Sequence, residues 1–137
     1  MAKCRIYIMS NNWKSKNRHK YLLQYHIIFV CKYRNKLLVS KSVSDDIKQF
    51  SYEICQKHNV IIHKMETDKD HIHYMIETEP NINLSDLVRT MKSYTTYHIW
   101  KSHNEYLSKQ FWTDGYFVCS IGNVSEKMLK EYIENQG

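Results

Sequence analysis

The segment VIIHKMETDKDHIHYMIET, residues 60–78, decides the fold. It holds two runs of β-forming residues, 60–67 and 71–78, joined by three polar residues, and this pattern predicts an antiparallel hairpin. Successive side chains of a strand point to opposite faces, so His71 and His73 share one face while the apolar residues that alternate with them share the other. We expect the apolar face to pack on helices and the two imidazoles to lie on the open face of the sheet.

Further elements are predicted on both sides of this hairpin. β-Forming residues alternate along 22–33, and apolar residues recur at helical spacing before and after the hairpin. The expected elements are a strand at 22–33, a helix from a Ser42 or Ser44 cap to about residue 58, a helix from an Asn83 cap to about Trp100, a strand within 111–122 and a helix at 125–136. The order βαββαβα predicts an α+β fold of the ferredoxin-like or RRM-like type, an antiparallel sheet with helices packed on one face.

The composition is that of one globular domain. The chain has 137 residues, 42% of them hydrophobic, and we expect a single domain over 1–137. No apolar run is long enough to span a bilayer, so we expect a cytoplasmic protein with no membrane partner. The four cysteines form no C-x-x-C pair, which argues against a zinc ribbon or a disulfide framework and predicts reduced, structural thiols.

Positive charge is concentrated toward the N-terminus. Residues 1–44 contain ten Lys or Arg and no Asp or Glu, whereas residues 45–137 contain ten basic and fourteen acidic residues. In a basic arm at 1–20, cationic and aromatic residues are interleaved, a composition suited to phosphates and unstacked bases. The alternative is a solvated arm that binds nothing. The candidate nucleic-acid contacts on the arm are Lys14, Lys16, Arg18 and Lys20.

Two motifs carry the candidate chemistry. His71 and His73 could hold a metal or an anion between them, although an isolated H-x-H pair more often binds nothing. Tyr132 and Gln136 are four residues apart and share one face of the expected last helix, whose final turn is prone to fraying. They could supply a reactive phenol and a third ligand, or Tyr132 could simply belong to an apolar stripe. Four other histidines are assigned to structure or surface because none has a partner at ligand spacing: His26, His63, His98 and His103.

Taken together, the motifs closely resemble one known family. The H-x-H strand is followed by Y-x-x-x-Q on the last helix, and the chain also carries KYR at 32–34, LSDLVRTMKS at 84–93 and FWTDGYFV at 111–118. In this order the motifs resemble the single-tyrosine HUH transposases of the IS200/IS605 family, over residues 21–136. The resemblance implies one HUH (Y1) transposase domain with the HUH endonuclease fold.

The resemblance implies a metal-dependent DNA strand transferase. Tyr132 would be the nucleophile that nicks and rejoins single-stranded DNA at insertion-sequence ends, through a 5′-phosphotyrosine intermediate. His71, His73 and Gln136 would bind Mg²⁺ or Mn²⁺, which would stabilise charge on the scissile phosphate. Asp70, next to the pair, could orient an imidazole.

The resemblance also implies partners. Members of the family recognise a DNA hairpin and act as homodimers, so Tyr132 and Gln136 would serve the partner's His71 and the partner's His73; assembly within one chain is the alternative. Two other functions stay open: a non-cleaving RRM-like module that binds single-stranded nucleic acid, and a domesticated HUH nuclease that acts on chromosomal repeat hairpins. Further candidate DNA contacts are Lys32, Arg34, Arg89, Lys92 and Ser93.

Overall fold

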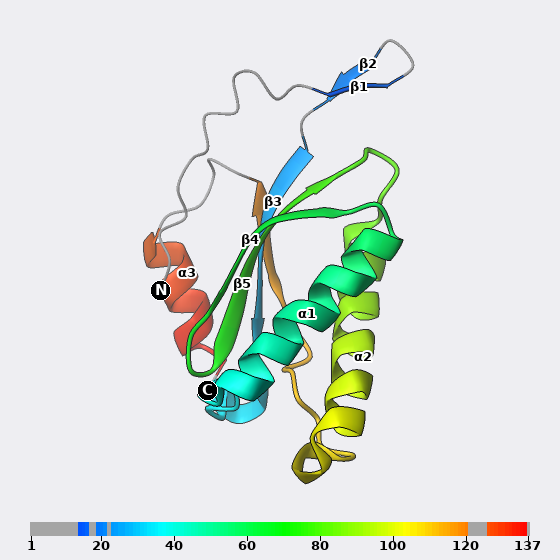
Figure 1. Ribbon diagram of the computed structural model, residues 1–137. Coiled ribbons are helices and arrows are strands. Elements are labelled where there is room, and N and C mark those ends of the chain that lie inside the picture. The colour runs from blue at the N-terminus through cyan, green and yellow to red at the C-terminus, as the bar shows by residue number, and fades with distance from the viewer. Residues whose placement is uncertain (1–13, 17–18, 22, 121–125, 137) are drawn as a thin grey trace.

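A four-stranded antiparallel sheet organises the described part of the chain (Figure 1). The computed structural model describes residues 14–16, 19–21, 23–120 and 126–136. The strands are β3 (Leu23–Val30), β4 (Ile61–Thr67), β5 (His71–Thr78) and β6 (Phe117–Ser120), in the order β4-β5-β3-β6. Every neighbouring pair is antiparallel. The predicted hairpin, now β4 and β5, and the predicted α+β fold are confirmed.

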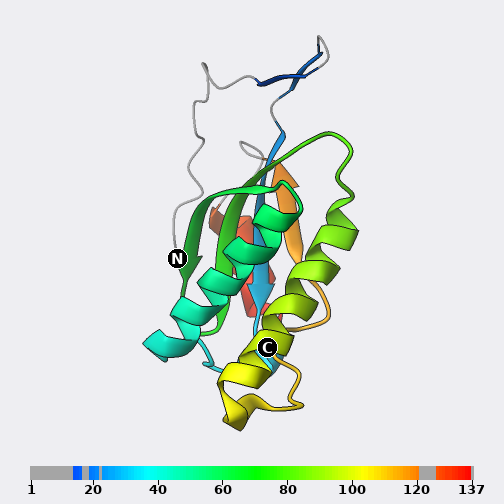
Figure 2. The same cartoon turned by 45° about the vertical axis from the view of Figure 1, so that its right-hand side comes forward.

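Two long helices cover one face of this sheet. α1 (Lys41–Lys57) and α2 (Leu84–Ser102) lie side by side there in both views (Figures 1 and 2). Their apolar stripes pack on alternate strand residues, including the fully buried Phe29 and Tyr74. The buried Tyr74 hydroxyl lies 2.7 Å from the hydroxyl of Ser51 on α1, which satisfies a group that would be costly to bury alone.

The start of α2 agrees with the sequence prediction, and the start of α1 does not. The Asn83 side chain accepts a hydrogen bond from the Asp86 backbone N–H, as expected of an N-cap. The cap of α1 is Ser40, whose hydroxyl accepts from the N–H three residues later, and not Ser42 or Ser44. All three serines carry a suitable hydroxyl, but only Ser40 stands before the first helical turn with an extended backbone.

The opposite face of the sheet carries α3 (Glu126–Glu134). Its Ile133 packs on Ile28 and Val30, which point away from α1 and α2. The expectation of helices on one face therefore holds for α1 and α2, whereas α3 covers the other face. The physical reason is that residues 27–30 of β3 are all apolar and fully buried, so this central strand needs cover on both sides.

The N-terminal arm contains a small hairpin that the sequence analysis did not predict. β1 (Lys14–Lys16) pairs with β2 (His19–Tyr21), so part of the arm has regular structure. No helix among the described residues is both long enough and apolar enough to cross a membrane.

Two predicted strands are shorter than expected. The strand predicted at 22–33 ends at Val30, and a 3₁₀ turn, η1 (Lys32–Arg34), follows it with positive φ at its last two residues. A second 3₁₀ turn, η2 (Asn104–Tyr106), follows α2. The strand predicted within 111–122 is regular only over β6, although Trp112 forms an isolated antiparallel bridge with Cys31.

Candidate active site

The two histidines of the H-x-H motif lie side by side on one face of β5. The alternate residue Tyr74 belongs to the core beneath α1 and α2, so His71 and His73 face the other way, as predicted. Their surroundings differ from the prediction, because His71 is 5% exposed and His73 is 3% exposed. This face of the sheet is not open, since α3 packs on part of it.

A chain of polar contacts holds the ring of His71. Its Nδ1 lies 2.9 Å from an Asp70 carboxylate oxygen, and the other oxygen accepts a hydrogen bond of 3.0 Å from Arg34 Nε. Burial raises the pKa of Asp70, but hydrogen bonds from His71 and Arg34 outweigh it and hold the pKa below its ordinary value. The η1 turn brings Arg34 into position through positive φ angles of 57° at Tyr33 and 53° at Arg34 itself. The KYR and H-x-H motifs therefore meet at this carboxylate.

His73 is held by a residue that the sequence analysis set aside. Its Nε2 lies 2.9 Å from Nδ1 of His26 on β3, and the two ring planes are nearly parallel, with centroids 5.0 Å apart. Burial lowers the pKa of both imidazoles, that of His73 to about 4, helped by its proximity to His26. The sequence analysis found no partner for His26 at ligand spacing and did not predict this contact. Strand parity could have revealed it, because His26 shares its face with Ile28, which pairs with His73.

Tyr132 lies on α3 and covers the same face of the sheet as the two histidines, but over β6. Its ring packs on Phe117 of β6 with centroids 5.4 Å apart. Its hydroxyl is buried and has no hydrogen-bond partner among the described residues, and burial raises the pKa of the phenol to about 12. A Cβ placed on Gly115 would lie 3.8 Å from this hydroxyl, so the glycine backbone lies directly beside the phenol oxygen.

The histidine pair and Tyr132 share a face but lie over different strands. Ile28 of the central strand pairs with His73 on one side and with Phe117 on the other. Neighbouring strands are about 4.8 Å apart, so His73 and the residue under Tyr132 are separated by roughly 10 Å across the sheet. Within one chain, the two motifs are therefore on the same surface with β3 between them.

Gln136 lies just beyond α3, so it is not on the helix as predicted. The helix ends at Glu134, and the Gln136 backbone N–H donates to the Ile133 carbonyl at 3.1 Å in a tighter closing turn. Its side chain is partly buried. Among the described residues, no three His, Cys, Asp or Glu side chains come together as a metal-holding group, so a complete cation site would need a ligand such as this carboxamide.

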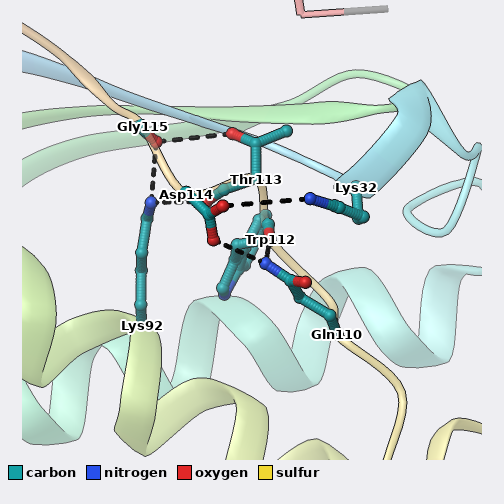
Figure 3. A network of polar contacts seen from close by, with 7 residues as sticks. All are labelled: Lys32, Lys92, Gln110, Trp112, Thr113, Asp114 and Gly115. Atoms are coloured by element: carbon teal, nitrogen blue, oxygen red, sulfur yellow. Dashed lines mark hydrogen bonds and ion pairs between the residues drawn. The ribbon is translucent and has the colours of Figure 1, made fainter.

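The segment before β6 is tied to α2 by Lys92 (Figure 3). Lys92 Nζ donates to the carbonyls of Thr113 and Gly115, each at 2.7 Å. Burial lowers the pKa of Lys92 to about 8, an effect that the nearby Asp114 opposes. Gln110 also bonds the Asp114 carboxylate, at 2.8 Å. These contacts fix the backbone that lies beside the Tyr132 hydroxyl.

The predicted DNA contacts have different environments. Arg34 bonds Asp70, and Lys92 bonds the two backbone carbonyls described above. Lys32 lies 3.9 Å from Asp114. The well-exposed Arg89 pairs with Asp86 at 3.1 Å. Ser93 is exposed and lines an open cavity of about 570 Å³ between α2 and residues 108–114, together with aromatic side chains such as Tyr97. Of the arm residues, Arg18 lies outside the described residues, and for three others only the backbone of β1 and β2 is described: Lys14, Lys16 and Lys20.

The sequence matches transposases over most of its length. A family model described as "Transposase IS200 like" matches residues 19–136. The ISDra2 transposase TnpA of Deinococcus radiodurans is 24% identical over 133 aligned residues, and the match covers 94% of this chain and 94% of that protein. The transposase for insertion sequence element IS200 of Salmonella typhimurium is 26% identical over 127 residues, 90% of this chain and 82% of that protein.

Solved structures agree with the fold. A crystal structure of a candidate transposase from Deinococcus radiodurans R1 has a TM-score of 0.80 and 25% identity, over 90% of this chain and 97% of that chain. A REP-associated tyrosine transposase bound to a REP hairpin has a TM-score of 0.57 and 15% identity, over 88% of this chain and 69% of that chain. The second likeness concerns the fold alone.

Proposed function

The chain belongs to the IS200-like transposase family, and from this premise we propose that Tyr132 is the nucleophile with which it cleaves and rejoins single-stranded DNA. The family match spans 19–136 and so includes the KYR, H-x-H and Y-x-x-x-Q motifs. This coverage carries the proposal.

The proposed chemistry exchanges one phosphodiester for another. The Tyr132 oxygen attacks the scissile phosphorus and displaces the 3′ oxygen, which leaves a 5′-phosphotyrosine and a free 3′-OH. Attack by a second 3′-OH on the phosphotyrosine reverses the exchange, so rejoining needs no nucleotide hydrolysis. The phenol must lose its proton, and burial raises its pKa to about 12 in the present arrangement. A cation or a base that reaches the phenol in the DNA complex would therefore be required.

We propose that His71, His73 and Gln136 hold Mg²⁺ or Mn²⁺. Histidine ligands must be neutral, and the buried His73 has a pKa of about 4. Ionised Asp70 only accepts hydrogen bonds, so His71 gives it the Nδ1 proton and keeps the lone pair on Nε2 that a metal needs. The donor set thus fits a divalent cation. When bound, the cation would polarise a non-bridging phosphate oxygen and stabilise charge in the transition state.

We propose a single strand with a hairpin as the substrate. The REP-associated relative is bound to a REP hairpin, and the basic arm of this chain is suited to phosphates. Away from the arm, Arg89 is 75% exposed at its side chain and Ser93 lines the cavity beside α2, so these two could reach a backbone or a base without rearrangement. Lys92 and Arg34 would contact DNA only with the donors left after their contacts within the protein.

We further propose a homodimer in which Tyr132 and Gln136 act on the histidine pair of the other subunit. The roughly 10 Å across the sheet between His73 and the residue under Tyr132 is the observation in favour. Mixing Tyr132→Phe protein with His71→Ala protein tests this. Assembly in trans restores one intact site per mixed dimer and thus covalent adduct formation, whereas assembly within one chain leaves the mixture inactive.

Adduct formation tests the function itself. Single-stranded DNA carrying candidate element ends and a 3′ label is incubated with protein and Mg²⁺ or Mn²⁺ and run on a denaturing gel. Wild type should retain the label covalently, and Tyr132→Phe and His71→Ala should not, while Tyr132→Phe still binds the DNA. Tyr52→Phe, a matched change at an exposed tyrosine, should form the adduct. An adduct that persists in Tyr132→Phe would exclude this nucleophile, and a wild type that binds but never cleaves family substrates would favour a binding module.

A further inference from the structure

The imidazole pair formed by His26 and His73 is the feature from which a new role follows. The two rings belong to neighbouring strands, β3 and β5, and are 1% and 3% exposed. Their nitrogens Nδ1 and Nε2 are 2.9 Å apart, and the ring planes differ by only 19°. Both backbones are fixed by the ladder between the two central strands, so this contact is part of the rigid sheet.

A hydrogen bond between two imidazole nitrogens needs one donor and one acceptor. A histidine that binds a metal gives the lone pair of one nitrogen to the metal and can carry a proton only on the other. The contact with His26 can therefore persist in a metal-bound protein only if His73 donates its Nε2 proton. His26 Nδ1 is then the acceptor, and His73 offers Nδ1 to the cation.

We propose that His26 is a positioning residue that fixes the tautomer and orientation of His73 for metal binding; this inference rests on the proposed metal centre. His71 is held in the same manner by Asp70, through the opposite ring nitrogen. Partners of this kind orient a ligand and raise its basicity, and their loss typically lowers metal affinity 10- to 100-fold. The two ligands would thus have separate supports, a carboxylate for His71 and a neutral imidazole for His73.

The second nitrogen of His26 supports a role beyond packing. With Nδ1 accepting, Nε2 carries the proton, and this atom is buried with no hydrogen-bond partner within the described ranges. A buried polar group left unsatisfied is uncommon and calls for a reason. An apolar residue would fill the same place without that cost, so the presence of a histidine there is explained if His73 needs its acceptor.

Two substitutions separate the acceptor from the ring. His26→Phe keeps a buried ring and removes the acceptor, whereas His26→Gln removes the ring and offers a carbonyl oxygen in its place. His98→Phe is the matched control, because the His98 ring packs on Tyr94 with centroids 4.2 Å apart and lies on α2, outside the site. The readout is Mn²⁺ affinity of the DNA-free protein, measured from the electron paramagnetic resonance signal of unbound Mn²⁺, with circular dichroism as the check of folding.

We expect His26→Phe to weaken Mn²⁺ binding about 10- to 100-fold. His26→Gln should recover most of that loss, and His98→Phe should match wild type. Equal affinity of His26→Phe and wild type would overturn the proposal. So would loss in His26→Gln equal to that in His26→Phe, which would show that an acceptor at this position does not support metal binding.

Nitrogen-15 NMR of the ring nitrogens gives a second test that needs no variant to fold. Metal-free wild type should carry the His73 proton on Nε2, and Mn²⁺ should broaden the Nδ1 signal first. A proton on His73 Nδ1, or displacement of His26 when metal binds, would overturn the proposal. A wild-type protein that binds no Mn²⁺ at His71 and His73 would refute the metal centre itself. If wild type binds Mn²⁺ and His71→Ala does not, the metal centre stands, and a failed test then concerns the role of His26 alone.

Discussion

Asp70→Asn tests whether the contacts among Arg34, Asp70 and His71 hold the histidine site together. The Asp70 carboxylate accepts from Arg34 Nε at 3.0 Å and faces His71 Nδ1 at 2.9 Å, with only 13% of its side chain exposed. Asparagine keeps the shape, but its uncharged oxygen accepts more weakly from Arg34, and its NH₂ group can face His71 Nδ1 only if that imidazole moves its proton to Nε2. A hydrogen bond to a charged group contributes about 1.5–3 kcal/mol. Because Arg34 is 37% exposed, we expect a loss of about 2 kcal/mol, toward the lower end.

Thermal unfolding of the metal-free protein measures this loss. At about 2.1 cal/mol/K per residue, the 137-residue chain has an unfolding entropy of about 0.29 kcal/mol/K, so a loss of about 2 kcal/mol lowers Tm by about 7 °C. Asp45→Asn is the matched control, since Asp45 forms a 2.9 Å ion pair with Lys41 in which the side chains are 56% and 87% exposed. The control should lose less than about 0.5 kcal/mol. An Asp70→Asn protein as stable as this control at neutral pH would refute the reasoning.

The difference in stability between wild type and Asp70→Asn should depend on pH in a defined direction. The pKa of Asp70 is held below its ordinary value in the folded protein. The stabilisation is therefore complete above the ordinary carboxyl range and is lost as the pH falls through the lower folded pKa. The Tm gap between wild type and Asp70→Asn should narrow as the pH approaches about 2. A gap that stays constant over this range would show that the carboxylate charge is not its source.

Three further changes test other contacts. Tyr132→Phe should raise Tm slightly, equivalent to up to about 1 kcal/mol, because the buried hydroxyl has no partner among the described residues; a clear fall in Tm would mean that the hydroxyl is bonded. Ser51→Ala should lower the free energy of unfolding by about 1–3 kcal/mol in urea titrations, since it leaves the Tyr74 hydroxyl buried and unsatisfied, and a change near zero would contradict this. Burial lowers the pKa of Lys92 to about 8, against an ordinary value of 10.5, so the unfolded chain binds more protons between these values. The stability of wild type relative to Lys92→Met, from urea midpoints, should accordingly rise between about pH 8 and about pH 10, and a flat or falling difference would be the opposite result.

The fold was largely predictable because its strongest signals are local. The bounds of β5 match the alternation of the sequence, and the Asn83 cap forms the hydrogen bond expected three residues on. The Ser40 cap was missed because neighbouring serines compete on equal terms in the sequence. The position of α3 was missed for another reason: a strand buried on both faces has no alternation to show which face a later helix will cover.

The site was predictable only where its residues are close in sequence or belong to a family motif. His71 and His73 are two apart on one strand, so their shared face followed from spacing. His26 is 47 residues from His73, and its contact depends on which strands become neighbours. Lys92 stays a candidate DNA contact, but its bonds to two backbone carbonyls of the segment before β6 could not be read from its place in the sequence. Side-chain partners across the fold are set by tertiary packing, which one sequence does not specify.

The contact between Arg34 and Asp70 bears on how an alanine scan of this protein should be interpreted. An arginine that binds a DNA phosphate and an arginine that supports His71 both lower activity when replaced. Loss of one phosphate contact reduces the slope of log affinity against log salt by about 0.7 on single strands, whereas loss of the bond to Asp70 leaves that slope unchanged and weakens metal binding instead. A scan that records only activity would count Arg34 among the DNA contacts whether or not it touches the strand, and salt titrations are what separate the two roles.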